Sequence, residues 1–458
     1  MSQLGTEANP LLVAIVGSGP SGFYACEALL KSETSVKVTM LERLPVPYGL
    51  VRSGVAPDHP KLKQAIQVYA KIAESPNFTL LANVTVGTDI SVEQLQQTHH
   101  AVIFANGAET DRRLGVAGED LQGSYTATEF VGWYNGHPDY RECEFDLSSE
   151  KAVIIGQGNV AADVARILAK SVDELRHTDI AEHALDALAE SQVKEIYVVG
   201  RRGPAQVKFT PKELREFENL EICQSIVDPA ELALNPASES ELEDKGNSGQ
   251  KKIYQQLQKL SSMETRDTSR SCHFTFLKSP AELKGDGKLQ SVVFEKNKLS
   301  GDALQQSARG TGEFEEMETS LLFRSIGYRG VALPGAPFDD KKGLIPNIDG
   351  RVTENGAALE GLYVTGWIKR GPTGIIGTNR ADSVATIASL MEDLDSLEKP
   401  EKPGGADGVC QLLESRDVRY VSFDDWKLID QSEINRGQPR GKPREKYTYI
   451  DEMLSLLD

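Results

Sequence analysis

A glycine-rich turn between an apolar strand and a helix lies near the start of the chain and constrains the fold more than any other feature. Residues 11–30 have the sequence LLVAIV-GSGPSG-FYACEALL. In such a strand–turn–helix unit, Gly17 permits the tight turn, Gly19 lets the backbone approach a pyrophosphate, and Gly22 allows the helix to pack on the strand. The segment predicts a dinucleotide-binding unit, the alternative being a glycine-rich turn in an unrelated sheet.

An acidic residue ends the next expected strand. The apolar segment 36–41 leads into Glu42, which lies 20 residues after Gly22. In dinucleotide-binding folds a carboxylate at this position binds the hydroxyl groups of a ribose. Glu42 is therefore a candidate cofactor-binding residue beside the first glycine-rich turn.

The same pattern occurs a second time in the middle of the chain. Residues 151–168 have the sequence KAVIIGQGNVAADVARIL, in which Ala161 replaces the third glycine, a permitted variant. The next expected strand, 195–200, is followed by Arg201 and Arg202 instead of an acid. Two guanidinium groups can hold a 2′-phosphate through bidentate, charge-assisted hydrogen bonds. The second site should prefer NADP(H) over NAD(H), unless the two arginines are an ordinary solvated pair.

Two such units in one chain predict the fold class and the domain order. We expect an α/β protein with two Rossmann-like, three-layer domains, binding FAD in the first and NADPH in the second. Apolar strands ending in small-residue turns, at 101–108 and 321–328, are expected to be the hinge strands. The expected boundaries are 1–108 and 326–395 for the FAD-binding domain, 109–325 for an inserted NADP-binding domain, and 396–458 for a linker and a C-terminal helical appendage. The polar stretch 235–270 has no place in this pattern.

Charge and cysteine content exclude several classes of protein and site. A net charge of −18 disfavours binding to nucleic acid or anionic lipid, and no apolar stretch approaches the roughly 20 residues of a membrane span. The five cysteines form no CxxC motif, and His99 and His100 would diverge in a helix or a strand. No metal site is predicted. Residues 1–10 lack the pattern of a signal or transit peptide, so a cytoplasmic location is expected.

Four longer motifs are more specific than the glycine patterns. They are LPVPYGLVRSGVAPDHP at 44–60, GQGNVA at 156–161, GRRGP at 200–204 and GWIKRGPTG at 366–374. In their order and spacing, the chain resembles the adrenodoxin-reductase-type ferredoxin–NADP(+) reductases, including the bacterial members of that family. Ala162 departs from the family, whose members carry Leu there, and this change concerns packing more than cofactor identity.

The resemblance implies a set of cofactor-binding residues. FAD is expected to contact Ser21 at the first helix, Glu42 at the ribose, Leu50, the backbone of Val86 at the adenine, and Trp367, Gly374, Ile375 and Ile376 along the isoalloxazine. NADPH is expected to contact Gln157, Gly158, Asn159 and Val160 at the pyrophosphate, Arg201 and Arg202 at the 2′-phosphate, Glu213 near the adenosine ribose, and Gly374 at the nicotinamide. For Trp367 the alternative is an ordinary core position.

The implied activity is that of a flavoprotein that passes electrons from NADPH through FAD, one at a time, to an acidic ferredoxin-like iron–sulfur protein. A hydride would pass from nicotinamide C4 to flavin N5, which requires positioning and no nucleophile. The missing CxxC pair fits this chemistry. The alternatives are an NADPH-dependent reductase of a small molecule such as a quinone, and a non-catalytic sensor that binds FAD and NADPH. Dependence on ferredoxin would exclude the first, and flavin bleaching by NADPH the second.

Two polar residues and several basic ones are further candidates. By the resemblance, His59 and Glu216 are a catalytic pair that tunes the flavin or handles protons. His59 could equally begin a helix, and Glu216 could belong to an exposed helical face with Lys212 at i, i+4 spacing. The candidates for contact with the acidic partner, unless they are simply solvated charges, are Lys208, Lys212, Arg215, Lys369 and Arg370. The chain is expected to be a monomer.

Overall fold

The computed structural model describes residues 3–400 and 403–458 and divides into two units. Unit 1 comprises Met1–Thr110 and Tyr328–Asp458, and unit 2 comprises Asp111–Gly327. The chain leaves unit 1 through β5 (Thr110–Asp111) and returns through β15 (Tyr328–Arg329). The domain boundaries expected from the sequence, after residues 108 and 325, each lie two residues before these boundaries.

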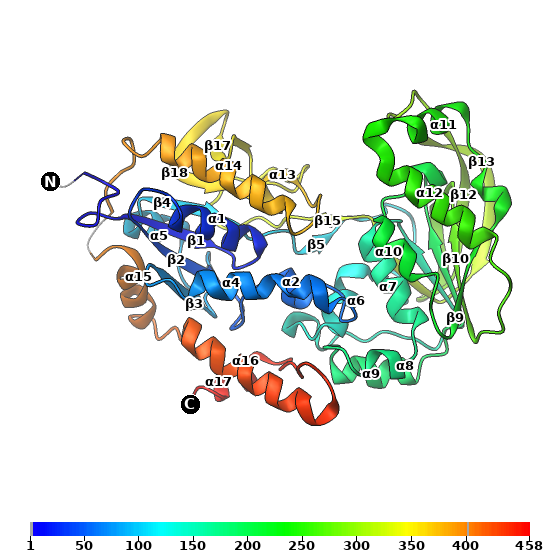
Figure 1. The fold of residues 1–458 in the computed structure, drawn as a ribbon, viewed down its shortest axis with the longest axis horizontal. Coiled ribbons are helices and arrows are strands. Elements are labelled where there is room, and N and C mark those ends of the chain that lie inside the picture. The colour runs from blue at the N-terminus through cyan, green and yellow to red at the C-terminus, as the bar shows by residue number, and fades with distance from the viewer. Residues whose placement is uncertain (1–2, 401–402) are drawn as a thin grey trace. The chain divides into compact units, whose positions relative to one another are not determined.

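A seven-stranded sheet forms the centre of unit 1 (Figure 1). Its strand order is β16-β17-β18-β4-β1-β2-β3, and the strands from β18 to β3 are parallel. The strands are β1 (Leu11–Val16), β2 (Val36–Glu42), β3 (Phe78–Ala82), β4 (Ala101–Phe104), β16 (Asn347–Ile348), β17 (Arg351–Glu354) and β18 (Ala357–Val364). The central strands are almost continuously apolar because both faces of the sheet are covered.

Helices cover both faces of this sheet. One apolar cluster joins Phe23 of α1 (Pro20–Leu30), Tyr69 of α4 (Ala65–Ala73) and Leu390 of α14 (Thr378–Glu392). The opposite cluster includes Leu95 of α5 (Val92–Thr98) and Val409 of α15 (Gly405–Glu414). Short helices α2 (Leu50–Ser53), α3 (Pro60–Lys63) and α13 (Trp367–Arg370) lie in the connections. Unit 1 is therefore a three-layer α/β fold, as predicted.

Unit 2 has a six-stranded parallel sheet in the order β6-β14-β7-β8-β10-β9. Its strands are β6 (Ser124–Thr126), β7 (Lys151–Ile155), β8 (Glu195–Val199), β9 (Cys223–Val227), β10 (Arg270–Thr275) and β14 (Leu321–Arg324). Helices α6 (Ala127–Tyr134), α7 (Asn159–Ala169), α8 (Val172–Leu175), α9 (Glu182–Ala189) and α10 (Pro211–Glu216) accompany them. An antiparallel sheet of β11 (Lys278–Asp286), β12 (Lys288–Ser300) and β13 (Ser307–Glu318) contributes Leu283, Val292 and Phe294 to a second cluster with Val153 and Leu322.

The polar stretch 235–270 contains two helices of unit 2. They are α11 (Pro236–Glu243) and α12 (Ser248–Ser261). Ile253, Leu257 and Leu260 are buried in the main cluster of unit 2. Their spacing is helical, but the polar residues between them obscured the pattern in the sequence.

The C-terminal segment packs on unit 1. Part of the expected linker, residues 401 and 402, lies outside the described residues. Val421 pairs with Ala82 at the end of β3 through two backbone hydrogen bonds of 2.8 and 2.9 Å. Trp426 and Ile429 of α16 (Phe423–Gly437) join the apolar cluster of α1, and α17 (Ile450–Ser455) adds Met453. No helix in the described part of the chain combines the length and apolar character of a membrane span.

The adjacent histidines are buried in unit 1 and face different partners. His99 Nε2 lies 3.0 Å from Thr39 Oγ1, and its Nδ1 lies 2.9 Å from Thr98 Oγ1. His100 Nδ1 accepts a hydrogen bond from the backbone of Leu12 at 3.0 Å. Burial lowers the pKa of His99 to about 4. At neutral pH this imidazole is therefore uncharged.

We expect unit 1 to lose stability in mild acid because of His99. Its folded pKa lies below the ordinary value of 6.5, so the unfolded chain binds the proton first as the pH falls. The loss begins near the ordinary value, grows toward about 4, and amounts to about 2 kcal/mol between about pH 7.5 and pH 5. Urea unfolding of the wild type and of His99→Gln at both pH values measures this difference. Equal pH dependence of the two proteins would contradict it.

Candidate dinucleotide-binding sites

The three glycines of the first fingerprint differ in whether the protein itself leaves room for a side chain. Gly17 has a φ of +106°, and a Cβ there would lie 2.7 Å from the carbonyl oxygen of Ala105. A Cβ on Gly22 would lie 2.1 Å from the carbonyl oxygen of Gly17, whereas one on Gly19 would meet no atom within 4 Å. Packing of the protein itself therefore requires Gly17 and Gly22. Gly19 leaves open space in front of the N-terminus of α1.

Glu42 is fixed beside this loop by three donors. Its Oε2 accepts from the backbone N of Ser18 at 3.1 Å and from Ser18 Oγ at 2.6 Å. Its Oε1 accepts from the backbone N of Leu44 at 3.1 Å. The carboxylate expected to bind a ribose is thus held at the end of β2, next to the fingerprint. Ser18 was not singled out in the sequence.

A tight turn places Leu50 close to the same loop. Tyr48 has a φ of +87° and Gly49 one of +48°, and Leu50 begins α2 directly after them. A Cβ on Gly49 would lie 3.0 Å from Gly19 Cα, so the turn contacts the fingerprint. Val86 is buried in the connection after β3.

The segment after β18 carries the residues expected along the isoalloxazine. Trp367 begins α13, and its indole Nε1 donates to the carbonyl oxygen of Thr373 at 3.2 Å. Gly374 has a φ of +84°, and Ile375 is 63% exposed. An apolar side chain with this exposure at the end of a tight turn is available to a planar ring. Ile376 is half-buried.

Asp382, which the sequence did not reveal, organises this segment from α14. Its Oδ2 accepts from the backbone N of Gly366 at 2.6 Å and from Thr365 Oγ1 at 3.2 Å. It also forms an ion pair of 3.0 Å with Lys369, while Arg370 donates to Asn379 Oδ1 at 2.6 Å. Lys369 and Arg370 therefore each have a side-chain partner within unit 1, and their contact with a partner protein stays a prediction.

The residues of unit 1 fit a dinucleotide. Asn106, in the turn that follows β4, has a buried Oδ1 with no hydrogen-bond partner. The same turn contacts Gly17, because a Cβ on Gly17 would lie 3.0 Å from Asn106 Cα. A buried polar atom without a partner is costly, and a bound cofactor would satisfy it. Together with the open space at Gly19, this atom supports FAD as the ligand of unit 1.

The second fingerprint repeats the arrangement of the first in unit 2. A Cβ on Gly156 would lie 2.0 Å from the carbonyl oxygen of Ser325, whereas one on Gly158 would meet no atom within 4 Å. The side chain of Gln157 donates to the carbonyl oxygen of Thr275 at 2.8 Å, and Asn159 Oδ1 accepts from the backbone N of Thr210 at 2.8 Å. Because both side chains form hydrogen bonds within the protein, the loop can bind a pyrophosphate mainly through the backbone N–H groups at the start of α7. Val160 is half-buried in the first turn of that helix.

Arg201 and Arg202 follow β8 as two adjacent cations. Arg201 is exposed and Arg202 is half-buried, and within the described residues neither guanidinium forms an ion pair with a carboxylate. Burial lowers the pKa of Arg202, and the charge of Arg201 lowers it further. A bound phosphate would relieve this repulsion. The pair therefore fits a 2′-phosphate.

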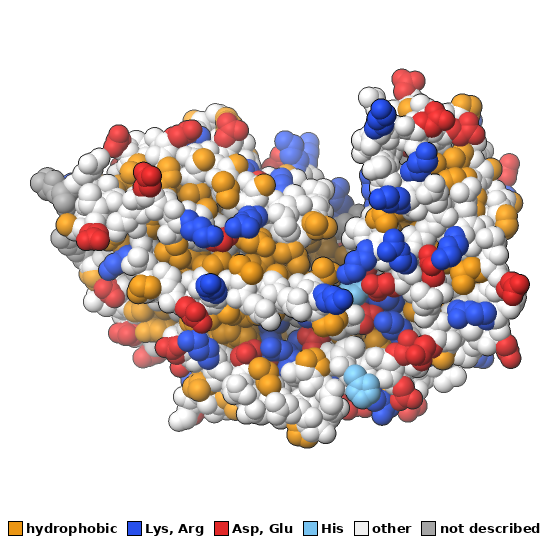
Figure 2. All heavy atoms as spheres, in the orientation of Figure 1, with side chains coloured by type: hydrophobic (Ala, Val, Ile, Leu, Met, Phe, Trp, Pro, Cys, Tyr) orange, Lys and Arg blue, Asp and Glu red, His pale blue; other side chains and the backbone are white. Residues whose placement is uncertain are grey.

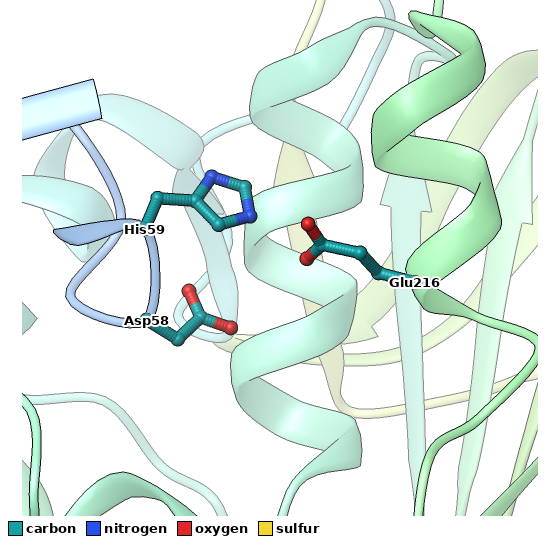
Figure 3. A group of neighbouring side chains, drawn as sticks. All are labelled: Asp58, His59 and Glu216. Atoms are coloured by element: carbon teal, nitrogen blue, oxygen red, sulfur yellow. The ribbon is translucent and has the colours of Figure 1, made fainter. Parts of the chain in front are cut away.

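Glu213 and Glu216 lie on α10 and share one buried cation. Arg166 of α7 is fully buried, and its guanidinium lies 3.4 Å from Glu213, 3.4 Å from Glu216 and 2.7 Å from Asp163. The sequence did not single out Arg166. Figure 3 shows the Glu216 carboxylate projecting from α10 of unit 2, and the side chains of Asp58 and His59 projecting from the loop before α3 of unit 1. The joint role of His59 and Glu216 stays a prediction.

Comparison with known proteins places the chain among reductases. Residues 12–214 match the model of the family described as pyridine nucleotide-disulphide oxidoreductase. The five cysteines of this chain, Cys26, Cys143, Cys223, Cys272 and Cys410, are all free thiols.

Curated relatives and solved structures resemble the chain over nearly its full length. The NADPH-ferredoxin reductase FprA of Mycobacterium leprae is 46% identical, covering 97% of this chain and 98% of the relative. The mitochondrial NADPH:adrenodoxin oxidoreductase of Arabidopsis thaliana is 43% identical, covering 98% and 95%. The structure of Mycobacterium tuberculosis FprA in complex with NADPH has a TM-score of 0.92 and 43% identity, covering 98% of this chain and 99% of that one. The chain therefore belongs to the family of the NADPH-ferredoxin and NADPH:adrenodoxin reductases.

Proposed function

We propose that this chain is an oxidoreductase that takes electrons from NADPH, passes them through FAD, and delivers them to a ferredoxin-type iron–sulfur protein. The observation that carries the proposal is the difference between the two fingerprints. The loop of unit 1 lies beside a fixed carboxylate, Glu42, whereas Arg201 and Arg202 follow the end of β8, the next strand after the loop of unit 2. The names of the relatives support both the nucleotide and the acceptor.

The residues of the chain would bind and position the cofactors. When bound, a flavin supplies the conversion between a two-electron hydride donor and a one-electron acceptor. Glu42 orients the FAD ribose from the end of β2, because Ser18 and Leu44 hold both of its oxygens. Asp382 fixes the segment that carries Trp367. Arg201 and Arg202 select the nucleotide by its 2′-phosphate.

The acceptor is proposed to dock through exposed basic side chains of unit 2. Lys208, Lys212 and Arg215 are exposed, and Figure 2 shows Lys and Arg side chains over the part of unit 2 that carries α10 and α12. On a chain of net charge −18, such a basic region would attract an acidic carrier, with a rate that falls as salt is added.

Anaerobic stopped-flow absorbance tests the nucleotide half of the proposal. Mixing the purified flavoprotein with NADPH is expected to bleach the flavin band at least about 100-fold faster than mixing with NADH, because NADH lacks the phosphate that the arginine pair binds. Absence of bleaching with either nucleotide would leave the non-catalytic sensor as the function.

Cytochrome c reduction tests the acceptor half. With NADPH present, the rate is expected to depend on added ferredoxin and to fall as ionic strength rises. Quinone reduction that is equally fast without ferredoxin would instead support the small-molecule reductase. The monomeric state and the cytoplasmic location stay predictions, which sedimentation and cell fractionation would check.

A further inference from the structure

A buried cluster of charges joins the C-terminal segment to α2 in unit 1. Arg52 donates to both oxygens of Glu433, at 2.9 and 2.5 Å. The side chain of Glu433 is fully buried and that of Arg52 is 7% exposed. Arg444 lies 3.1 Å from Glu433 and 2.5 Å from Asp430. The backbone N of Tyr447 also donates to Glu433, at 3.1 Å.

Glu433 is the centre of this cluster. Burial alone would raise its pKa, but the charges of Arg52 and Arg444 lower it, so the carboxylate is ionised at neutral pH. Removing its charge leaves the guanidinium of Arg52 buried without an anion, which is strongly unfavourable. Apolar side chains of similar size could pack at this place without any loss of stability. Stability alone therefore does not account for the buried charges.

Arg52 lies one turn beyond the strained turn that contacts the first fingerprint. The backbone N of Arg52 donates to the carbonyl oxygen of Gly49 at 3.0 Å. The preceding Tyr48 has a φ of +87°, a conformation that a bulky residue keeps only where its surroundings hold it. The ion pair between Arg52 and Glu433 is one such restraint.

The same helix of the C-terminal segment restrains Tyr48 directly. The indole Nε1 of Trp426 donates to Tyr48 Oη at 3.4 Å, and the two rings meet edge to face with centroids 5.8 Å apart. The guanidinium of Arg52 lies 5.1 Å from the centre of the Trp426 ring. Tyr48 in turn donates its backbone N–H to the carbonyl oxygen of Ser18 at 3.1 Å, and Ser18 holds Glu42. Contacts therefore run without a break from α16 to the carboxylate expected at the FAD ribose.

We propose that Glu433 is a positioning residue of the FAD site, which acts through Arg52 to hold the turn of Tyr48, Gly49 and Leu50 against the fingerprint. The inference rests on the proposed function insofar as unit 1 binds FAD. It makes the C-terminal segment, which the sequence marked only as an appendage, part of the apparatus that retains the cofactor.

Release of FAD from the full-length holoprotein tests this role. Flavin fluorescence, followed after dilution of the holoprotein to a concentration at which released FAD does not rebind, gives the dissociation rate without reference to turnover. For Glu433→Gln we expect FAD to dissociate at least roughly 10-fold faster than from the wild type. Arg52→Lys keeps the charge but loses the bidentate geometry, and it should also release FAD faster. It serves as the second test if Glu433→Gln does not fold.

Two further variants separate positioning from general stability. Glu445 is buried in the same segment and its side chain pairs with Lys442, so Glu445→Gln disturbs a buried ion pair that does not include Arg52 and leaves the backbone hydrogen bond from Glu445 to Glu433 in place. It should release FAD at the wild-type rate. In the double variant Arg52→Gln/Glu433→Gln, release should be no faster than in the faster of the two single variants Arg52→Gln and Glu433→Gln, since both single changes break the same Arg52–Glu433 ion pair.

The outcomes distinguish this role from the proposed function. A wild-type protein that does not bind FAD would overturn the proposed function itself. A wild-type protein that holds FAD, with Glu433→Gln releasing it at the same rate, would overturn only the positioning role. Equal acceleration by Glu433→Gln and Glu445→Gln would also overturn it, because the effect would then be loss of packing in the segment as a whole.

Discussion

Replacing both Arg201 and Arg202 with alanine is expected to raise the KM for NADPH by about 100-fold or more and to leave the KM for NADH within about two-fold. Hydrogen bonds to charged groups contribute about 1.5–3 kcal/mol each, and every 1.4 kcal/mol is about tenfold in affinity. Neither guanidinium has an ion-pair partner within the described residues, so the change removes interactions with the nucleotide and disturbs no internal pair. Steady-state kinetics with both nucleotides measures the effect.

Arg176→Ala provides the matched control for this prediction. Arg176 is an exposed arginine of the same unit, paired with Asp173 at the surface, and its loss should change neither KM. If the double variant raised the KM for NADPH and the KM for NADH to the same extent, the arginines would have a structural role. If neither KM changed, they would be the solvated pair that the sequence left as an alternative.

The second large effect is expected for Gly19→Ala, which should weaken FAD binding without destabilising the protein. A Cβ on Gly19 meets no protein atom within 4 Å, so Gly19→Ala should leave the stability of the FAD-free chain within about 0.5 kcal/mol. The methyl group would occupy the space expected for the pyrophosphate, and the affinity for FAD should fall by about 10-fold or more. Titration of apoprotein with FAD, followed by flavin fluorescence, measures this loss.

Gly22→Ala is the companion variant, and its effect is expected on the stability of the protein and not on the space for the ligand. Its Cβ would lie 2.1 Å from the carbonyl oxygen of Gly17, and relief of that overlap should destabilise the FAD-free protein by about 1–3 kcal/mol or more. Thermal unfolding of the two apoproteins separates them. If Gly19→Ala destabilised the apoprotein as much as Gly22→Ala, the space in front of α1 would serve packing of the chain and not a ligand.

The elements that could be predicted from the sequence are determined by residues close together in the sequence. Each fingerprint, with its strand and helix, occupies a short segment whose glycines have local causes, so β1, α1, β7 and α7 were expected from the sequence. Buried parallel strands appear as continuous apolar runs, which also revealed β4 and β14. The helix α12 was missed because its three buried apolar residues are spread among polar ones.

The residues that could not be predicted owe their roles to distant partners. Asp382 is recognisable only when α14 lies beside the segment after β18, and Arg166 only when α10 lies beside α7. Glu433 is separated from Arg52 by 381 positions, and no periodicity connects them. The backbone carbonyls that the side chain of Gln157 contacts likewise belong to other strands. The internal partners of Lys369 and Arg370, Asp382 and Asn379, were hidden in the sequence for the same reason.

The position of unit 2 within the chain has a consequence for the order of events during synthesis. Unit 2 is one continuous segment, Asp111–Gly327, whose strands are all available once residue 327 has left the ribosome. The sheet of unit 1 must wait, because β4 pairs with β18 and Ala82 pairs with Val421. Nascent chains halted just after residue 327 has left the ribosome should therefore contain a folded unit 2 and an incomplete unit 1, and they should acquire flavin only after the last helices have emerged.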